Sequence, residues 1–150
     1  MRTVDKIAQE ANRSRSSRGS SFEEYLSDVF SRLKRKGEIK DFVKKPSIFD
    51  GEFNPDFLII KNSGKIICID ATTTARTDRL RAKQWDAYGT KLFFREIERK
   101  NITAYTVVGE PSTNKREKDN FRHCKEKCKL PHSALDDTVS LKELLDIIRK

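Results

Sequence analysis

The sequence predicts an α/β fold in which helices flank a mixed central sheet. Three observations lead to this prediction. Apolar residues between positions 22 and 33 recur with the spacing of one helix face. Two short apolar runs, at residues 57–60 and 66–69, are separated by a turn and are typical of paired strands. A β-branched run at residues 102–108 adds a strand after a second helical pattern, and such alternation favours helices packed on a sheet.

The size and charge of the chain narrow its class. Its 150 residues fit one domain, and its net charge of +9 favours an anionic partner, of which nucleic acid is the leading candidate. No lipidation motif, membrane span or signal-peptide core is present in the sequence, so we expect no membrane partner. Three cysteines, an odd number, do not make a disulfide framework, and a cytoplasmic protein is expected.

The chain divides into residues 1–20, expected to be a flexible basic arm, and a single domain at 21–150. Arg13, Arg15 and Arg18 stand among serines in the arm. Two interpretations remain open for them: a solvated tail without a role, or an arm that lies on DNA phosphates.

The first helix is predicted to begin at Ser20 and Ser21 and to end at Gly37. A strand at 39–43 and a loop at 46–51 follow, before the two paired strands. One apolar stripe runs along the helix: Phe22, Leu26, Val29, Phe30 and Leu33.

The second half continues with a helix from Asp78, in which Gly89 predicts a break or kink. After the 102–108 strand come a charged helical segment, a short strand near 135–139 and a last helix. Ser140 and Glu143 form a capping box at the start of that helix. Three aromatic side chains at helical spacing are expected in the core rather than stacked on bases: Trp85, Phe93 and Phe94.

Two aspartates stand at the ends of the paired runs. Asp56 precedes the first run and Asp70 follows the second. Residues two apart in a strand share a face, so Asp70 and Thr72 point the same way. If the strands pair, both carboxylates converge, and oxygen ligands of this kind suit Mg²⁺ or Mn²⁺. The alternative is structural, because aspartates often start strands and cap turns.

A third carboxylate is available on the first helix. Glu23 lies about 100° from Phe22, on the flank of the apolar stripe, whereas Glu24 faces solvent. Glu23 therefore either leans towards the sheet or completes a capping box with Ser20 as N-cap.

The order Pro55-Asp56, strand hairpin, Asp70-Ala71-Thr72 resembles the PD-(D/E)xK nuclease superfamily, which includes restriction endonucleases and Holliday junction resolvases. The resemblance covers residues 20–108 and implies a restriction-endonuclease-like fold with an α-β-β-β-α-β core. It also implies that Asp56, Asp70 and the Ala71 carbonyl hold Mg²⁺, with Glu23 matching the helix glutamate of some members.

Thr72 departs from the pattern, because the superfamily usually has a lysine there. Threonine can orient water but cannot supply a positive charge. Three explanations remain open: a polar variant of the site, a lysine that reaches in from elsewhere, or a site that only binds. Lys83 on the next helix is the best candidate for such a lysine, and Lys65 is a poor one.

Threonines followed by spaced arginines resemble a DNA-contacting segment in one subgroup of restriction enzymes. The resemblance implies phosphate or base contacts for Arg76, Arg79 and Arg81. The alternative is a solvated basic helix start.

Four side chains in the charged segment offer zinc ligands: His123, Cys124, Cys128 and His132. Adjacent His123 and Cys124 point about 100° apart on a helix, and the usual Cys-x-x-Cys knuckle is missing. Reduced cysteines on a basic helix are the favoured interpretation, and zinc is not expected.

The sequence thus predicts a Mg²⁺-dependent DNA endonuclease, with Mn²⁺ as a substitute, that is sequence-specific and of restriction or homing type. Asp56 and Asp70 would hold the ion with Glu23, Thr72 would orient water, and Lys83 would supply charge. A Holliday junction resolvase, or a non-catalytic DNA-binding protein on a decayed nuclease fold, are the alternatives. Cutting both strands from one site per domain requires a homodimer, a higher oligomer or a partner subunit.

Overall fold

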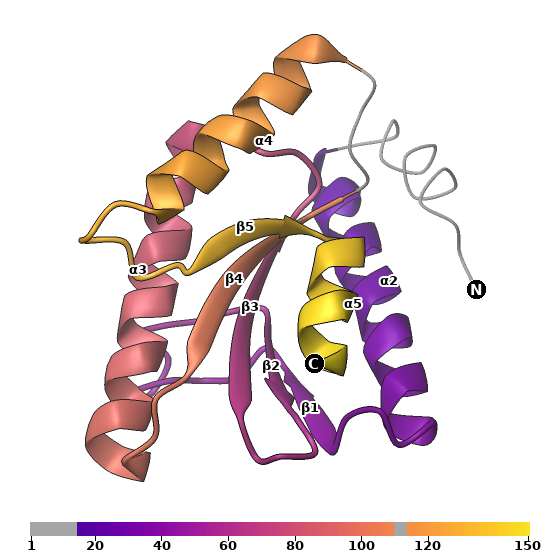
Figure 1. The fold of residues 1–150 in the computed structure, drawn as a ribbon, viewed down its shortest axis with the longest axis vertical. Helices are drawn as coiled ribbons and strands as arrows, with labels where there is room; N and C mark the ends of the chain where they lie inside the picture. The colour runs from indigo at the N-terminus through magenta and orange to yellow at the C-terminus, as the bar shows by residue number, and fades with distance from the viewer. Residues whose placement is uncertain (1–14, 110–113) are drawn as a thin grey trace.

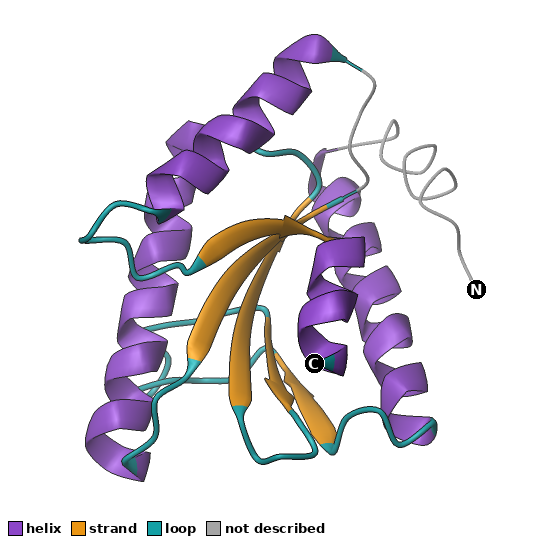
Figure 2. Cartoon of the chain, viewed as in Figure 1, coloured by secondary structure: helices purple, strands orange, loops and turns teal. Residues whose placement is uncertain are grey.

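The computed structural model describes residues 15–109 and 114–150, which form a mixed sheet between two layers of helices (Figures 1 and 2). Within these residues the sheet has five strands in the order β1-β2-β3-β4-β5. The first three strands pair antiparallel and the last three pair parallel. Helices α2 and α5 cover one face and α3 and α4 the other, which confirms the predicted α/β class.

The elements have these bounds: α2 Arg15–Arg35, β1 Asp41–Lys44, β2 Phe57–Ile60, β3 Ile66–Thr72, α3 Thr77–Phe93, a π-helical turn Phe94–Glu98, β4 Thr103–Val108, α4 Lys115–Cys128, β5 Asp137–Ser140 and α5 Leu141–Arg149.

Helix α2 begins earlier than the sequence predicted. It starts at Arg15, so the expected start at Ser20 and Ser21 is wrong, and position 20 lies inside a helix rather than at the end of an arm. Arginine and serine are tolerated in helices and a single glycine costs only about 1 kcal/mol, so nothing local prevents the extension. Arg13 lies outside the described residues.

The C-terminus of α2 is set by Gly37, as predicted. Gly37 has φ 76°, its N–H donates to the Lys34 carbonyl (3.0 Å), and the Glu38 N–H donates to the Leu33 carbonyl (2.8 Å). This pair of bonds is a Schellman motif, in which glycine takes the left-handed conformation without a steric cost.

Helix α3 runs through Gly89 without a break, so the predicted break is wrong. Instead, Gly89 lies against the Phe53 ring, and a Cβ placed there would overlap the ring atoms. Glycine is needed at this position because a loop approaches the helix closely, and this cause is invisible in local sequence. The helix continues into the π-helical turn and ends at Arg99, which is left-handed (φ 56°).

The final helix starts as its sequence predicted. The Ser140 hydroxyl accepts from the Glu143 N–H (3.2 Å), and the Glu143 carboxylate accepts from the Ser140 N–H (3.3 Å). Both bonds of the capping box are therefore present, and the short strand expected near 135–139 is β5.

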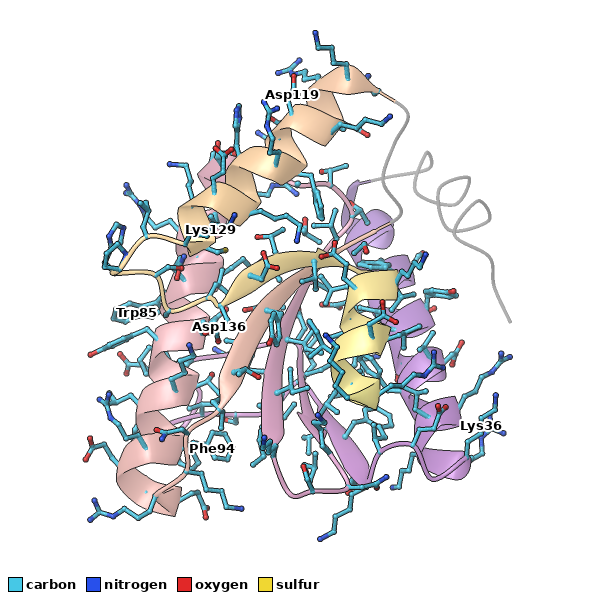
Figure 3. The ribbon with its side chains drawn as sticks, viewed as in Figure 1. Lys36, Trp85, Phe94, Asp119, Lys129 and Asp136 are labelled. Carbon is cyan, nitrogen blue, oxygen red and sulfur yellow. The ribbon has the colours of Figure 1, made fainter. Side chains whose placement is uncertain are left out.

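Two apolar clusters lie on opposite faces of the sheet. One joins α2 and α5 to residues such as Phe57 and Ile69, and the other packs under α3 with Cys68 and Phe94. Phe94 is buried as predicted and Phe93 is partly buried. Trp85 contradicts the prediction, because it projects from α3 with 53% of its surface exposed (Figure 3).

The cysteine-rich segment forms α4. Cys124 and Cys128 point into the core, whereas His123 and His132 are exposed. Within residues 15–109 and 114–150, no helix is both long and apolar enough to cross a membrane.

Candidate metal-binding site

The two predicted aspartates lie side by side at one end of the sheet. The β2–β3 register pairs Phe57 with Ile69, which places Asp56 next to Asp70, and the Asp56 N–H donates to the Ile69 carbonyl (3.0 Å). Both aspartates are buried, with 7% and 2% of their surfaces exposed. The strand pairing inferred from the sequence therefore brings these two carboxylates together.

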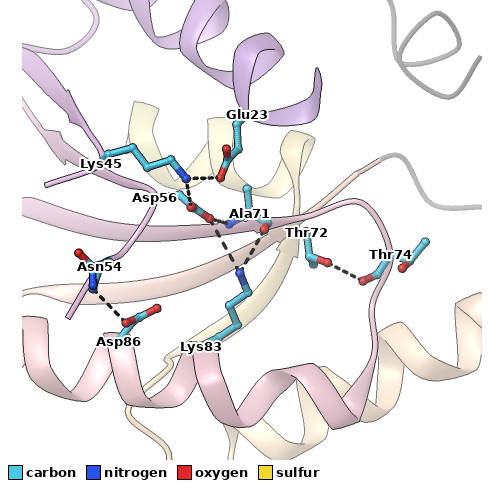
Figure 4. Close-up of polar contacts among 9 residues, drawn as sticks. All are labelled: Glu23, Lys45, Asn54, Asp56, Ala71, Thr72, Thr74, Lys83 and Asp86. Atoms are coloured by element: carbon cyan, nitrogen blue, oxygen red, sulfur yellow. Dashed lines mark hydrogen bonds and ion pairs between the residues drawn. The ribbon is translucent and has the colours of Figure 1, made fainter. Parts of the chain in front are cut away.

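Each oxygen of Asp56 has its own partners (Figure 4). Oδ2 accepts from the Ala71 N–H (2.7 Å) and lies 3.9 Å from Lys83 Nζ, while Oδ1 accepts from Lys45 Nζ (3.1 Å). Burial by itself would raise the pKa of Asp56, but hydrogen bonds with Glu23, Ala71 and Lys45 and the charge of Lys83 lower it. Asp56 is thus held as a carboxylate at the rim of the sheet.

The pKa of Asp70, in contrast to that of Asp56, is raised. Its Oδ2 atom has no hydrogen-bond partner among the described residues. Burial raises the pKa of Asp70 to about 8; Lys83 opposes this rise, and Asp56 and Asp86 add to it. Its neighbour in the β3–β4 register, Thr106, is also buried, and its hydroxyl has no partner in the described part of the chain. Unpaired buried polar atoms are costly and call for a missing partner.

Glu23 turns towards the sheet. Its Oε1 atom accepts from Lys45 Nζ (2.8 Å), and burial together with the neighbouring Asp56 raises the pKa of its carboxyl group. Because α2 already begins at Arg15, Ser20 is not an N-cap, and the capping-box interpretation of Glu23 is wrong. Glu24 is exposed, as expected from its position on the helix.

Thr72 follows Ala71 at the end of β3, and Lys83 contacts the Ala71 carbonyl from α3. The Thr72 hydroxyl donates to the Thr74 carbonyl (2.9 Å), which leaves only its lone pairs for another group. Lys83 Nζ donates to the Ala71 carbonyl (3.3 Å). The ammonium group of Lys83, on α3, therefore lies beside the carbonyl of the residue that precedes Thr72. Lys65 precedes β3 at its opposite end.

Lys45 is a site residue that the sequence did not single out. It follows β1, and its N–H donates to the Asp56 carbonyl (2.8 Å), so β1–β2 pairing brings it opposite Asp56. Asp86 was also missed: its carboxylate accepts from the Asn54 N–H (3.1 Å) and so ties the loop before Asp56 to α3. Strand register and helix placement, neither of which is a local pattern, would have been needed to find them.

The predicted DNA-contacting arginines occupy different environments. Arg76 forms a two-pronged ion pair with Asp78 (3.0 and 2.9 Å), whereas Arg79 and Arg81 are exposed on the first turns of α3. Arg15 and Arg18 lie in the first turns of α2. A small pocket lies beside this part of α3; Thr72, Arg76, Arg79, Lys83 and Thr106 are among its lining residues.

The donor set fits a hard divalent cation with two carboxylate ligands. Asp56, Asp70 and the Ala71 carbonyl offer oxygen atoms, and the unpaired Asp70 oxygen lacks the partner that a cation would supply. No group of three or more His, Cys, Asp or Glu side chains suited to a metal occurs in the described residues. Mg²⁺ commonly uses one or two carboxylates and keeps several waters, so two suffice.

The chain has a restriction-endonuclease-like fold. It is similar to the restriction endonuclease PspGI, solved in complex with its substrate DNA, with a TM-score of 0.51 and 15% identity. That match covers 97% of this chain and 66% of the PspGI chain, just under two thirds. It is also similar to the small subunit of the heterodimeric restriction endonuclease R.BspD6I, with a TM-score of 0.50, 17% identity and coverage of 97% and 74%. No protein-family model and no curated protein matches the sequence.

Proposed function

We propose that this protein is a Mg²⁺-dependent endonuclease that hydrolyses DNA phosphodiester bonds and accepts Mn²⁺ as a substitute. One observation carries the proposal: a buried aspartate with an unpaired oxygen, Asp70, lies beside Asp56 at the end of paired strands. Burying Asp70 in this way costs stability, and binding a cation is the use that would offset this cost. The fold and the net charge of +9 are consistent with a DNA substrate.

In this proposal Asp56, Asp70 and the Ala71 carbonyl hold the ion, and Glu23 adds negative charge at the rim. A bound Mg²⁺ ion would supply a more acidic water and neutralise charge on the phosphate. Lys83 provides the positive charge that Thr72 lacks, since its ammonium group already lies 3.3 Å from the Ala71 carbonyl. The lone pairs of the Thr72 hydroxyl remain able to accept a hydrogen bond from water.

The same proposal assigns DNA phosphates to basic residues around the site. Arg79 and Arg81 project from the start of α3, and Arg76 reaches DNA once it leaves Asp78; Arg13, Arg15 and Arg18 are assigned the same role from the sequence alone. A single site cuts one strand, so a homodimer or a partner subunit is required for a double-strand break. Sequence-specific cleavage of restriction or homing type is the preferred mode, and junction resolution is the alternative.

A second candidate is a DNA-binding protein without catalysis. The Thr72 hydroxyl proton is engaged by the Thr74 carbonyl, and lysines contact both Asp56 and Ala71. Such an arrangement also suits a nuclease fold in which internal ion pairs have replaced the metal. This candidate predicts DNA binding that does not depend on divalent ions.

The deciding experiment is cleavage of supercoiled plasmid and of a labelled four-way junction, in Mg²⁺ and in Mn²⁺. Asp70→Ala is the test variant, and Asp146→Ala, which changes an exposed aspartate on α5, is the matched control. Cleavage by the wild type and the control but not by Asp70→Ala supports the nuclease. Tight DNA binding without cleavage in either ion supports the second candidate and contradicts the first.

A further inference from the structure

Lys45 is held in an unusual backbone conformation beside the site. Its φ is 52°, in the left-handed region that a lysine rarely adopts. Pro46 follows it and disfavours the right-handed helical region for the residue before it. The Lys45 N–H donates to the Asp56 carbonyl (2.8 Å), so this conformation is tied directly to the residue that precedes β2. Backbone strain retained next to a candidate site points to a function for that residue.

The side chain of Lys45 bridges two carboxylates. Its Nζ atom lies 2.8 Å from Glu23 Oε1 and 3.1 Å from Asp56 Oδ1, so it joins α2 to the start of β2 (Figure 4). Without this ammonium group, two negative charges would lie close together at the rim of the sheet, and each would disfavour ionisation of the other. Lys45 is therefore the counter-cation of these two residues.

The two lysines of the site differ in accessibility. The side chain of Lys45 is 55% exposed, whereas that of Lys83 is 23% exposed and lies on the α3 side. Lys83 is also tied to the Ala71 carbonyl, but both partners of Lys45 Nζ are carboxylates. A divalent cation that approaches Asp56 therefore competes most directly with Lys45, whose side chain is the more exposed of the two.

We propose that Lys45 is an exchangeable internal cation, which a divalent ion displaces from Glu23 and Asp56 and which then binds a phosphate of the DNA. The inference rests on the proposed metal site and adds to it a link between metal binding and DNA binding. Once displaced, the ammonium group stays at the rim on a fixed backbone, within reach of an anion next to the ion. The divalent ion releases Lys45, and the released Lys45 binds the DNA phosphate. Metal binding and DNA binding therefore strengthen each other.

The test measures Mn²⁺ affinity by calorimetry in the absence of DNA, with thermal unfolding as a check that each variant folds. Lys45→Met should bind Mn²⁺ about tenfold more tightly than the wild type, because the competing cation is gone. Lys45→Arg keeps the charge and should bind Mn²⁺ like the wild type. Lys44→Met, at the exposed preceding position, is the matched control and should change nothing.

A second readout is DNA affinity with and without Ca²⁺, an ion that also prefers oxygen ligands. The ion should raise the DNA affinity of the wild type and of Lys44→Met, and this gain should fall at least fivefold in Lys45→Met. Unchanged or weaker Mn²⁺ binding by Lys45→Met, or an undiminished gain, overturns the inference and leaves the proposed function standing. If the wild type binds no Mn²⁺, the metal site and the inference both fail.

Discussion

The two faces of β3 make opposite use of equally deep burial. Ile69 and Asp70 are neighbours in the chain, with 0% and 2% of their surfaces exposed. Ile69 packs into the apolar cluster under α2 and α5, whereas Asp70 points to the α3 side with an unpaired oxygen. Successive side chains of a strand face opposite ways, so a shift of one residue separates an apolar core from a polar site.

The α2 and α5 face of the sheet stabilises the fold, whereas the end of the other face carries the candidate site. The α2 and α5 face gains free energy from apolar burial, roughly 25 cal/mol for each Å² removed from water. The end of the other face carries a buried carboxyl group and a buried hydroxyl, Thr106, whose atoms lack partners in the described residues. A site that costs stability in the metal-free protein persists only if the apolar face compensates for it.

The largest effect is expected on the polar face. Asp70→Asn should reduce DNA cleavage by at least about 1000-fold, equivalent to about 4 kcal/mol, because a neutral amide is a poor Mg²⁺ ligand. The same substitution should not lower the unfolding temperature of the metal-free protein, since burial already favours an uncharged group at this position. Initial cleavage rates and thermal unfolding in EDTA measure the two effects. A metal-free variant that is less stable than the wild type would contradict this account of Asp70.

On the apolar face, a substitution should lower stability and leave metal binding unchanged. Ile69→Ala removes buried methyl groups from a fully enclosed position and should lower the free energy of unfolding by about 3 kcal/mol. The matched control is Ile97→Ala, whose side chain is 60% exposed and whose replacement should cost less than about 0.5 kcal/mol. Urea denaturation measures both. Mn²⁺ affinity should stay unchanged in the folded Ile69→Ala protein, and its loss would show that the two faces are not separable.

Lys83 should matter for cleavage and little for folding. Lys83→Met removes the ammonium group beside the Ala71 carbonyl, and the cleavage rate should fall about 100-fold, or about 2.7 kcal/mol. Lys91→Met on the same helix breaks an ion pair with Asp136 away from the site and serves as control. Single-turnover rates at saturating Mg²⁺ compare the two variants. Equal rates for Lys83→Met and the wild type would exclude Lys83 as the replacement for the missing lysine.

A change in pH is expected to have a smaller effect, on the stability of the metal-free protein. The pKa of Asp70 rises from 3.8 to about 8 on folding, so the folded state binds an extra proton between these values. The contribution of this group to stability is therefore fully present below about pH 3.8 and is lost as the pH rises towards 8. Glu23, whose pKa is also raised, adds to the fall, whereas the lowered pKa of Asp56 stabilises the fold at neutral pH and loses this effect in acid.

Urea midpoints across this range, in EDTA and in excess Mg²⁺, measure the pH dependence. Mg²⁺ should flatten it because a cation favours ionised Asp70, and Asp70→Asn should flatten it without metal. A steep metal-free slope that persists in Asp70→Asn would assign the effect to other groups.

Local sequence predicted the features that depend on neighbouring residues. The capping box at Ser140, the helix end at Gly37 and the paired strands on either side of the turn all rest on contacts within a few positions. The proximity of Asp56 and Asp70 followed from the same strand pairing. These features need no knowledge of distant packing, because their hydrogen bonds close over short stretches of chain.

The predictions for Gly89 and Trp85 were wrong because they depend on contacts between segments that are distant in the sequence. Gly89 was interpreted as a break because the Phe53 ring that it accommodates lies 36 residues away in the chain. Trp85 was placed in the core by its spacing, yet α3 presents it to solvent beside Phe53 and Tyr88. Helical periodicity predicts which residues share a helix face, but it does not predict which face packs against the rest of the protein.

By itself, then, the sequence determined the fold class, the strand pairing and the two adjacent aspartates. Only the tertiary structure decided which other side chains reach them: Glu23 from α2, Lys83 from α3 and Lys45 from the end of β1. The physical reason is that these contacts depend on where whole elements pack and on the register of β1 against β2. Such distances are set by the apolar layers between helix and sheet, which no short pattern around each residue encodes.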